Sequence, residues 1–364
     1  MQTITINNHS YSFNEVKNSA YSIHDEYSTF VLNFCSEWLN GCNEFVFNTS
    51  GSTGVPKEVV AQRSQMRSSA QATIQALNLT STENIYLCIS AKMIGGAMML
   101  VRALELGCNI TIVSPTSNPF EQLNENHPYT LASFVPMQLY DAVTNFTLHN
   151  KLNRFSKILL GGAPASDNII TFLSTLKVKT WQTYGMTETL SHVALKLIGV
   201  DKYYTALPGV VFKQDERNCL CIESEITNNT WLITNDLINL ISPTQFELIG
   251  RIDDVINSGG IKIFTYDVEQ AIQRKLNELE IPPKPMFVCS KPDEKYGEVV
   301  VVIMLGKPLH ETIQNKITEY CKEILGKYAA PKHYYAVSEF ERLESGKVDK
   351  KKTLKTILNK LPNS

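Results

Sequence analysis

Short apolar stretches alternate with helical patterns through the first half of this chain, and this alternation restricts the possible folds more than any other feature. Apolar stretches of strand length lie at residues 85–89, 109–113, 132–135 and 157–160. Apolar residues at helical spacing over 95–106 separate the first two, and Pro136 can begin a helix because proline suits a first turn. Strands that alternate with helices predict a parallel sheet covered by helices.

Further elements are expected before this region. Residues 1–7 alternate apolar and polar side chains like an edge strand, a helix is expected over 27–39, and residues 44–47 indicate a short buried strand. Ser64 can cap a helix that runs to about Leu77.

Beyond Leu197 the apolar period changes towards two, and strands at 219–223 and 231–234 indicate a small antiparallel unit. The last part indicates α+β, with helices and strands at 266–279, 285–289, 299–304 and 309–325. A chain of 364 residues allows two domains of about 100–200 residues each. We therefore expect an α/β fold. Its large N-terminal domain (residues 1–250) has mainly parallel, helix-covered sheets plus the antiparallel unit, and a small, mobile α+β domain (residues 251–364) follows.

Composition excludes several classes of function. The chain is 43% hydrophobic and 19% charged, and its formal net charge is −2, so no basic field indicates nucleic acid or an anionic membrane as a partner. We see no signal peptide and no apolar run of about 18 residues that could span a bilayer, which predicts a cytoplasmic protein. The eight cysteines are scattered and are expected to be free thiols. A homo-oligomer stays open.

A run of hydroxylated residues and glycines follows the strand expected at 44–47. Glycines let main-chain N–H groups approach a ligand closely, hydroxyls add donors, and a lysine adds positive charge, so the run suits a polyphosphate. Pro56 separates it from Lys57, so it is not the Walker-type loop, and a polar surface turn is the alternative. The candidate phosphate-binding residues are Thr49, Ser50, Gly51, Ser52, Thr53, Gly54 and Lys57.

Four more strings stand out further along the chain. A turn, Gly161-Gly162-Ala163-Pro164, directly follows an expected strand, and ligands gather at the carboxyl ends of strands in α/β folds. The other strings are Tyr184-Gly185-Met186-Thr187-Glu188, Gly250-Arg251-Ile252-Asp253-Asp254 with Ser258-Gly259-Gly260, and Gly346-Lys347-Val348-Asp349-Lys350. Taken singly, each can be a plain turn, a helix cap or a solvated surface.

Together and in this order, the strings resemble the motifs of the adenylate-forming (acyl-CoA synthetase/ligase) superfamily, and the resemblance covers the chain from Phe45 onward. It implies that the 49–57 run binds phosphates and that Gly161, Gly162 and Ala163 lie against the adenine and the acyl substrate. The segment Tyr184-Gly185-Met186 would then also bind the nucleotide, with the tyrosine ring on adenine.

The same resemblance assigns the remaining roles. Thr187 would donate to the α-phosphate, and Glu188 would hold Mg²⁺, which proteins usually bind with a carboxylate and phosphate oxygens. Asp236, in Thr234-Asn235-Asp236, would grip the ribose, although the superfamily usually has Gly at the Asn position.

The C-terminal part would contain the hinge, the thiol channel and the catalytic lysine. Arg251 would contact the nucleotide, Asp253 would be the hinge, and Gly259-Gly260 would line the thiol channel. Lys347 would be the catalytic lysine, whereas Lys350, Lys351 and Lys352 are expected to be plain surface charges.

The implied reaction has two steps and uses ATP, Mg²⁺ and CoA. A carboxylate attacks the α-phosphorus of ATP to give an acyl-adenylate and pyrophosphate, and a thiol then displaces AMP. Lys347 would serve the first step and, after rotation about Asp253, would be withdrawn for the second.

The acid is indicated by a narrower resemblance. Residues 184–195 look like those of 2-succinylbenzoate–CoA ligases of menaquinone biosynthesis, which would place Ser191 and His192 by the acyl pocket. Lys92 can meet a second substrate carboxylate, with a solvated helix start as the alternative. About 45 residues precede the phosphate loop, fewer than in full-length ligases, which suggests a trimmed N-terminal lobe. Another aryl- or acyl-CoA ligase, an adenylation protein that loads a carrier thiol, or a non-catalytic nucleotide-binding homologue stay open.

Overall fold

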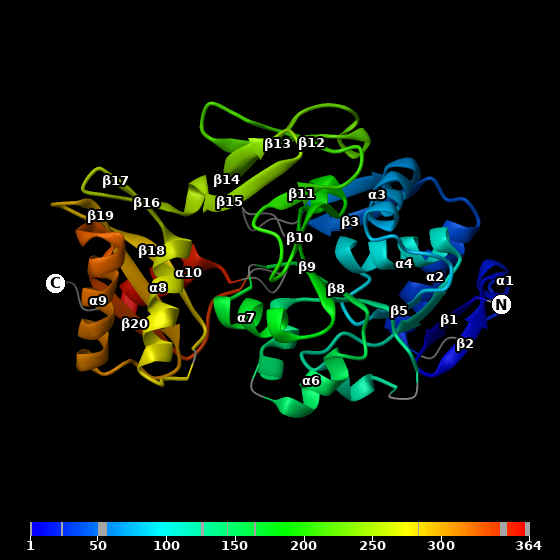
Figure 1. Cartoon of the computed structure of the whole chain (residues 1–364), viewed down its shortest axis with the longest axis horizontal. Helices are drawn as coiled ribbons and strands as arrows, with labels where there is room; N and C mark the ends of the chain where they lie inside the picture. Colours follow the sequence, from blue (N-terminus) through cyan, green and yellow to red (C-terminus); the bar gives the residue numbers. More distant parts are fainter. Residues whose placement is uncertain are drawn as a thin grey trace.

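The computed structural model describes residues 2–22, 25–49, 57–124, 127–143, 145–163, 165–282, 284–342 and 348–360. Within these residues a thirteen-stranded sheet occupies the chain up to Arg251 and a five-stranded sheet lies beyond it, so that a larger and a smaller part sit side by side (Figure 1). A two-stranded sheet of β3 (Glu44–Thr49) and β4 (Lys57–Gln62) is separate. The expected α/β class, with its own small C-terminal sheet, is confirmed.

Five parallel strands form the centre of the large sheet. In sheet order they are β9 (Lys179–Gly185), β8 (Lys157–Leu160), β7 (Leu131–Phe134), β5 (Asn84–Leu87) and β6 (Asn109–Ile112). Their apolar side chains are buried between layers that include α4 (Ile94–Leu106). The short helix α5 (Pro136–Leu139) begins at the predicted proline.

The N-terminal strand β1 (Thr3–Ile6) was expected at the edge of a sheet, and this prediction is wrong. It pairs in parallel with β6, and β2 (His9–Ser12) folds back against its other side. A tight turn with positive φ at Asn7 and Asn8 supplies that outer strand, so β2 forms the edge of the sheet.

The expected antiparallel strands are present, and they continue the large sheet. After β9 the chain turns back at once, and β10 (His192–Leu197) pairs antiparallel with it. Strand β9 is therefore hydrogen-bonded on both sides, and the parallel and antiparallel halves form one continuous sheet. The remaining strands are β11 (Tyr204–Ala206), β12 (Val211–Gln214), β13 (Cys219–Glu223), β14 (Leu232–Ser242) and β15 (Gln245–Arg251).

Helices α2 (Glu26–Leu39) and α3 (Arg63–Ala76) confirm two expected segments. Ser64 is not the cap of α3, because the helix begins at Arg63, and the backbone N–H of Gln62 donates to the side chain of Gln65 at 3.3 Å. The other helices of this part are α1 (Phe13–Lys17), α6 (Phe146–Leu152) and α7 (Asp167–Thr175).

The smaller part is α+β, as predicted. Its strands are β16 (Val255–Ser258), β17 (Ile261–Phe264), β18 (Met286–Asp293), β19 (Gly297–Leu305) and β20 (His333–Val337). Helices α8 (Thr265–Glu278) and α9 (Glu311–Leu325) pack on one face of the sheet, and α10 (Lys350–Lys360) packs on the other.

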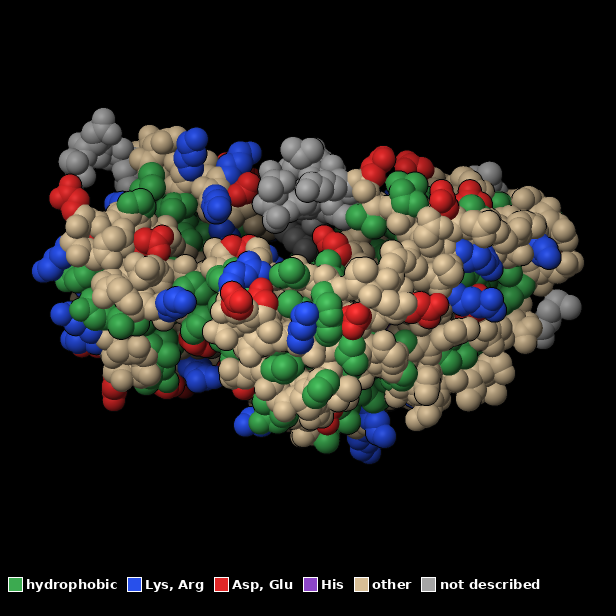
Figure 2. Space-filling model, turned by 90° about the horizontal axis from the view of Figure 1, so that it is seen from above, with side chains coloured by type: hydrophobic (Ala, Val, Ile, Leu, Met, Phe, Trp, Pro, Cys, Tyr) green, Lys and Arg blue, Asp and Glu red, His purple; other side chains and the backbone are tan. Residues whose placement is uncertain are grey.

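Polar contacts join the two parts. Arg274 of α8 pairs with Asp167 of α7 at 2.9 Å, and Asn277 donates to the side chain of Asn168 at 2.9 Å. On the face shown in Figure 2, acidic and basic side chains are interspersed among apolar and uncharged ones. All eight cysteines are free thiols, as expected. No described helix has the length and apolar character needed to cross a bilayer.

Candidate active site

The candidate site forms where β9 ends and the chain turns back into β10. The single turn η3 (Thr187–Thr189) joins these strands, and His192 lies opposite Gly185 in the antiparallel register. A Cβ at Gly185 would collide with the backbone of Ser191, so glycine permits this close return. The turn therefore places the nucleotide string and Ser191-His192 in one place.

On one side of this turn, four predicted residues form a continuous hydrogen-bonded chain, which we call the nucleotide-side cluster: Tyr184, Asp236, Arg251 and Asp253. The Tyr184 hydroxyl donates to one carboxylate oxygen of Asp236, and Arg251 Nη1 donates to the other at 3.1 Å. Arg251 Nη2 donates to Asp253 Oδ2 at 2.7 Å. The β14–β15 register places Asp236 directly opposite Arg251, which explains their contact.

The nucleotide-side cluster pairs its one cation with two carboxylates. Burial raises the pKa of Tyr184 well above its usual value, and the neighbouring Asp236 raises it further, so the phenol stays protonated and donates. Burial acts to lower the pKa of Arg251, but its bond to Asp253 and the charge of Asp236 outweigh it. Asp236 is buried, whereas Arg251 and Asp253 are nearly half exposed and accessible to a ligand.

On the other side lies a second group, which we call the acid-side cluster: Arg102, Ser191, His192 and Thr73. Arg102 Nη2 donates to Ser191 Oγ at 2.9 Å, and the same oxygen lies 3.4 Å from His192 Nδ1. The other ring nitrogen of His192 lies 2.9 Å from Thr73 Oγ1. Helices α3 and α4 and the start of β10 thus enclose a polar group inside the core.

Arg102 is a buried cation without a carboxylate partner among the described residues. It is 1% exposed, its Nε has no hydrogen-bond partner, and its Nη1 has only the sulfur of Met99, at 3.7 Å. Burial lowers the pKa of Arg102 to about 9, and burial together with Arg102 lowers the pKa of His192 well below its usual value. Such a charge is costly unless an anion meets it.

Sequence reasoning missed Arg102. The available signal was a lone arginine inside the apolar run Ile94–Leu104.

Thr187 and Glu188 lie between the two clusters. Glu188 is exposed and forms no ion pair with any described residue. No described group of three or more His, Cys, Asp and Glu side chains can hold a metal. A single free carboxylate fits Mg²⁺ that takes its other ligands from nucleotide phosphates and water.

The glycine turn after β8 packs against the same strand end. A Cβ at Gly161 would collide with the Thr183 hydroxyl, and Gly162 has φ +83°, so both positions favour glycine. Ala163 ends the described part of this turn, and Met186 precedes η3, where its N–H donates to Thr189 Oγ1 at 3.0 Å.

Other predicted residues lie away from this junction. Lys92 pairs with Glu26 at 2.6 Å on the surface and contacts no residue of the acid-side cluster among the described contacts. Ten residues of mostly helical chain separate it from Arg102, about 15 Å at a rise of 1.5 Å per residue. Gly259 and Gly260 form the turn of the β16–β17 hairpin, at the end opposite to the one that follows β15 (Figure 1).

Part of the predicted site lies outside the described residues. Ser50, Gly51, Ser52, Thr53, Gly54 and Lys347 belong to this group. Thr49 and Lys57 are described only as a backbone pair, at the end of the β3–β4 hairpin that leads into the candidate phosphate loop.

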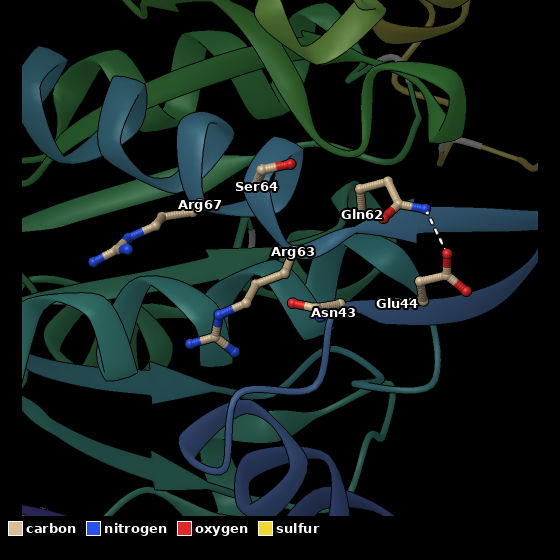
Figure 3. A pocket seen from close by; sticks show the side chains of 6 residues that line it. All are labelled: Asn43, Glu44, Gln62, Arg63, Ser64 and Arg67. Atoms are coloured by element: carbon tan, nitrogen blue, oxygen red, sulfur yellow. Dashed lines mark hydrogen bonds between the residues drawn. The ribbon is translucent and has the colours of Figure 1, made fainter.

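An open pocket of about 540 Å³ lies at the other end of this hairpin. Figure 3 shows Gln62 donating to Glu44 across the two strands, with Arg63 and Arg67 extending from the start of α3. The Glu44–Gln62 pair is five residues, or about 17 Å, from Thr49–Lys57 at the usual strand rise. This pocket therefore lies away from the Thr49–Lys57 end of the hairpin.

Comparison with protein families agrees with this geometry. The model of the AMP-binding enzyme family matches residues 44–216, and that of the AMP-binding enzyme C-terminal domain matches residues 285–347. An acyl-CoA synthetase (AMP-forming)/AMP-acid ligase II-like protein from Dyadobacter fermentans is 35% identical. The match covers 94% of this chain and 97% of that one, with a TM-score of 0.62.

More distant relatives are longer. The 2-succinylbenzoate–CoA ligase of Enterococcus faecalis is 26% identical over 337 residues, which is 84% of this chain and 68% of that protein. The O-succinylbenzoate coenzyme A synthetase of Bacillus subtilis, solved with ATP and magnesium ion, is 21% identical. It shares the fold with a TM-score of 0.71 over 85% of this chain and 69% of its own.

Proposed function

Since this chain belongs to the AMP-binding enzyme family and is an AMP-forming acid–CoA ligase, we propose that its acid substrate is 2-succinylbenzoate. The products would be 2-succinylbenzoyl-CoA, AMP and pyrophosphate, as needed for menaquinone biosynthesis. The relatives named as 2-succinylbenzoate–CoA ligases, which are about one quarter identical, support this choice.

The observation that carries the proposal is the buried Arg102, which has no carboxylate partner among the described residues. 2-Succinylbenzoate has two carboxylates, of which one reacts with ATP and the other stays ionised. A buried guanidinium beside the Ser191 hydroxyl can bind that second carboxylate with charge-assisted hydrogen bonds. A simple benzoate or a fatty acid would leave the cation unmatched.

The neighbouring His192 favours the same ligand. Its lowered pKa keeps the imidazole neutral near pH 7, so it adds no second cation and can donate or accept one hydrogen bond. Ser191 and His192 thus offer short polar contacts in an otherwise apolar surrounding, which suits an aromatic acid with one polar arm.

In the first step, the reacting carboxylate would attack the α-phosphorus of ATP and release pyrophosphate. Thr187 would donate to the phosphate oxygens, Glu188 would hold Mg²⁺, which neutralises phosphate charge, and Lys347 would stabilise the charge that develops. Tyr184 and Asp236 would orient the adenosine. In the second step the CoA thiol attacks the acyl carbonyl and AMP leaves.

We propose that residues 251–364 act as the lid domain, with Asp253 as its hinge. Among the described residues, the β15–η5 connection, the neighbouring strands β15 and β17, and exposed polar contacts such as Arg274–Asp167 join it to the larger part. Exposed polar contacts of this kind separate easily. Rotation would withdraw Lys347 and bring Gly259-Gly260 to the thiol channel.

The test is pyrophosphate release by the purified protein with ATP and Mg²⁺. 2-Succinylbenzoate is compared with benzoate, a fatty acid and an amino-acid panel, with and without CoA. Release that requires 2-succinylbenzoate, with a CoA thioester as product, supports the proposal. Turnover of another acid would remove the menaquinone assignment, whereas ATP binding without release for any acid would favour a non-catalytic homologue.

A further inference from the structure

The segment that carries Lys347 is closed at its base by described residues. Arg342 and Val348 pair as an antiparallel bridge. The N–H of Asp349 then donates to the carbonyl oxygen of Glu341 at 2.8 Å. Residues 341–342 and 348–349 thus form a paired base on the two sides of residues 343–347.

Lys350 connects this base to the predicted hinge. It is the first residue of α10, and its Nζ lies 3.5 Å from Asp254 Oδ2 and 3.7 Å from Glu269 Oε1. Asp254 belongs to η5 (Ile252–Asp254) and directly follows Asp253. Glu269 belongs to α8. One ammonium group thus joins the hinge turn, the first helix of the smaller part and the helix that follows Lys347.

The partner carboxylate of Glu269 is mostly buried. Its Oε1 also accepts the backbone N–H of Val288 in β18 at 2.8 Å. Burial raises the pKa of Glu269, and the positive charge of Lys350 opposes that rise. Without Lys350, this carboxylate would lose the cation that compensates its charge, which is unfavourable in a buried position.

The neighbouring lysines differ from Lys350. Lys351 is exposed and has no ion pair among the described residues, and Lys352 is exposed and pairs with Glu341 at 3.0 Å. The expectation that all three are plain surface charges holds for Lys351 but not for Lys350, whose side chain is 32% exposed and bound to two carboxylates.

We propose that Lys350 is a positioning residue for adenylation, which transmits the orientation of the hinge turn to the segment that carries Lys347. The inference rests on the proposed function, because that reaction defines the role of Lys347. When residues 251–364 rotate about Asp253, the contacts of Lys350 with Asp254 and Glu269 would keep the base of the segment fixed relative to the hinge turn. A misplacement of about 1 Å in a catalytic group can cost about 10²-fold in rate.

The test measures the two half-reactions separately in Lys350→Ala, Lys350→Arg and the matched control Lys351→Ala. Adenylation is followed as pyrophosphate release without CoA, with hydroxylamine to trap the acyl-adenylate. Thioester formation is followed from supplied acyl-adenylate and CoA. We expect Lys350→Ala to lower the kcat of adenylation about 10- to 100-fold and to change thioester formation less than about 2-fold. Lys350→Arg should restore adenylation, and Lys351→Ala should match the wild type.

Two outcomes would overturn the proposal. Equal losses in both half-reactions, together with a lower melting temperature, would indicate a purely structural role. Wild-type rates for Lys350→Ala would mean that the contacts do not position Lys347.

A second readout separates this proposal from the proposed function. Backbone hydrogen exchange at 340–342, 348–349 and 252–256 should be faster in Lys350→Ala than in Lys351→Ala. If the wild type turns over no acid, the proposed function fails. Backbone hydrogen exchange alone then decides whether Lys350 stabilises the paired residues on either side of 343–347. Unchanged exchange in Lys350→Ala overturns the proposal by itself.

Discussion

The two sides of the candidate site handle charge in opposite ways. In the nucleotide-side cluster, Arg251 lies between two carboxylates and nearly half of its side chain is exposed. In the acid-side cluster, Arg102 is fully buried and meets a hydroxyl and a thioether but no described carboxylate. The first side already pairs its cation with two carboxylates before any ligand binds, whereas the second has no anion among the described residues.

This difference indicates what each ligand has to supply. A nucleotide binds to groups that are already paired with one another. These contacts therefore mainly orient the nucleotide, which loses part of its hydration on binding. An anionic arm of the acid compensates a charge that the fold has already desolvated, and such preorganised charges are worth more than the same contact in water. Specificity for the acid should therefore depend on one residue more strongly than specificity for ATP does.

The largest effect is expected for Arg102→Met. Without the cation, a buried substrate carboxylate loses its partner, which typically costs about 3–5 kcal/mol, or about 10²- to 5 × 10³-fold in kcat/KM. The free protein should keep or gain stability, because an apolar side chain replaces an unpaired buried charge. The measurements are kcat/KM for 2-succinylbenzoate and the melting temperature.

Benzoate is the matched control substrate for this variant, because it lacks the second carboxylate. Any turnover of benzoate should change little in Arg102→Met, and so should the KM for ATP. Equal losses for both acids, with a lower melting temperature, would show that Arg102 only supports the fold.

A smaller effect is expected for Asp236→Asn on the nucleotide side. The amide keeps the shape but loses charge-assisted hydrogen bonds worth about 1.5–3 kcal/mol each, so kcat/KM for ATP should fall about 10- to 100-fold. Arg251 retains Asp253, which limits the loss of stability. Saturation curves for ATP with two different acids check this, since the loss should be the same for both.

Much of this comparison could be predicted from the sequence, for identifiable reasons. The buried strands β5, β7 and β8 are short apolar runs between turns, and such runs are local signals. Tyr184, Asp236 and Arg251 were selected from local strings, and strand pairing then placed them together.

The acid side shows why the rest could not be predicted. An arginine in an apolar helix is visible in the sequence, but its meaning depends on Ser191, which follows 89 residues later and meets it only because β10 folds back on β9. Likewise Lys350 gains its role from Glu269, far away in the chain. Tertiary contacts of this kind leave no local pattern.

The two sides of the site should contribute to the pH dependence of stability in different pH ranges. The pKa of His192 is lowered in the folded state, so below about pH 6.5 the unfolded chain binds a proton that the folded chain refuses, and stability falls as the pH decreases. One such group changes the free energy of unfolding by at most about 1.4 kcal/mol per pH unit. Unfolding of wild type and His192→Gln between pH 7.5 and 5 measures this difference.

The free energy of unfolding of His192→Gln should depend less steeply on pH than that of the wild type, by a slope of up to one proton.

The nucleotide side should titrate at lower pH. Burial acts to raise the pKa of Asp253, but Arg251 outweighs it and the pKa is lowered, so its contribution is present above about pH 3.9 and is lost below that. Equal slopes for both proteins from pH 7.5 to 5 would contradict a buried neutral His192.

The smallest effect is expected for Lys92→Ala, and it tests the comparison within one segment of chain. Lys92 lies just before α4 and Arg102 lies near the end of that helix, so both cations lie in one short segment of chain. Lys92, however, is exposed and already paired with Glu26. Exposed pairs contribute only about 0.2–1 kcal/mol, so stability should change little and kcat/KM for 2-succinylbenzoate should stay within about 2-fold. A loss as large as that of Arg102→Met would place the second carboxylate at the surface, and the buried arginine would then need another explanation. If Lys92→Ala has no effect on kcat/KM and Arg102→Met has a large one, burial rather than charge alone determines which residue recognises the acid.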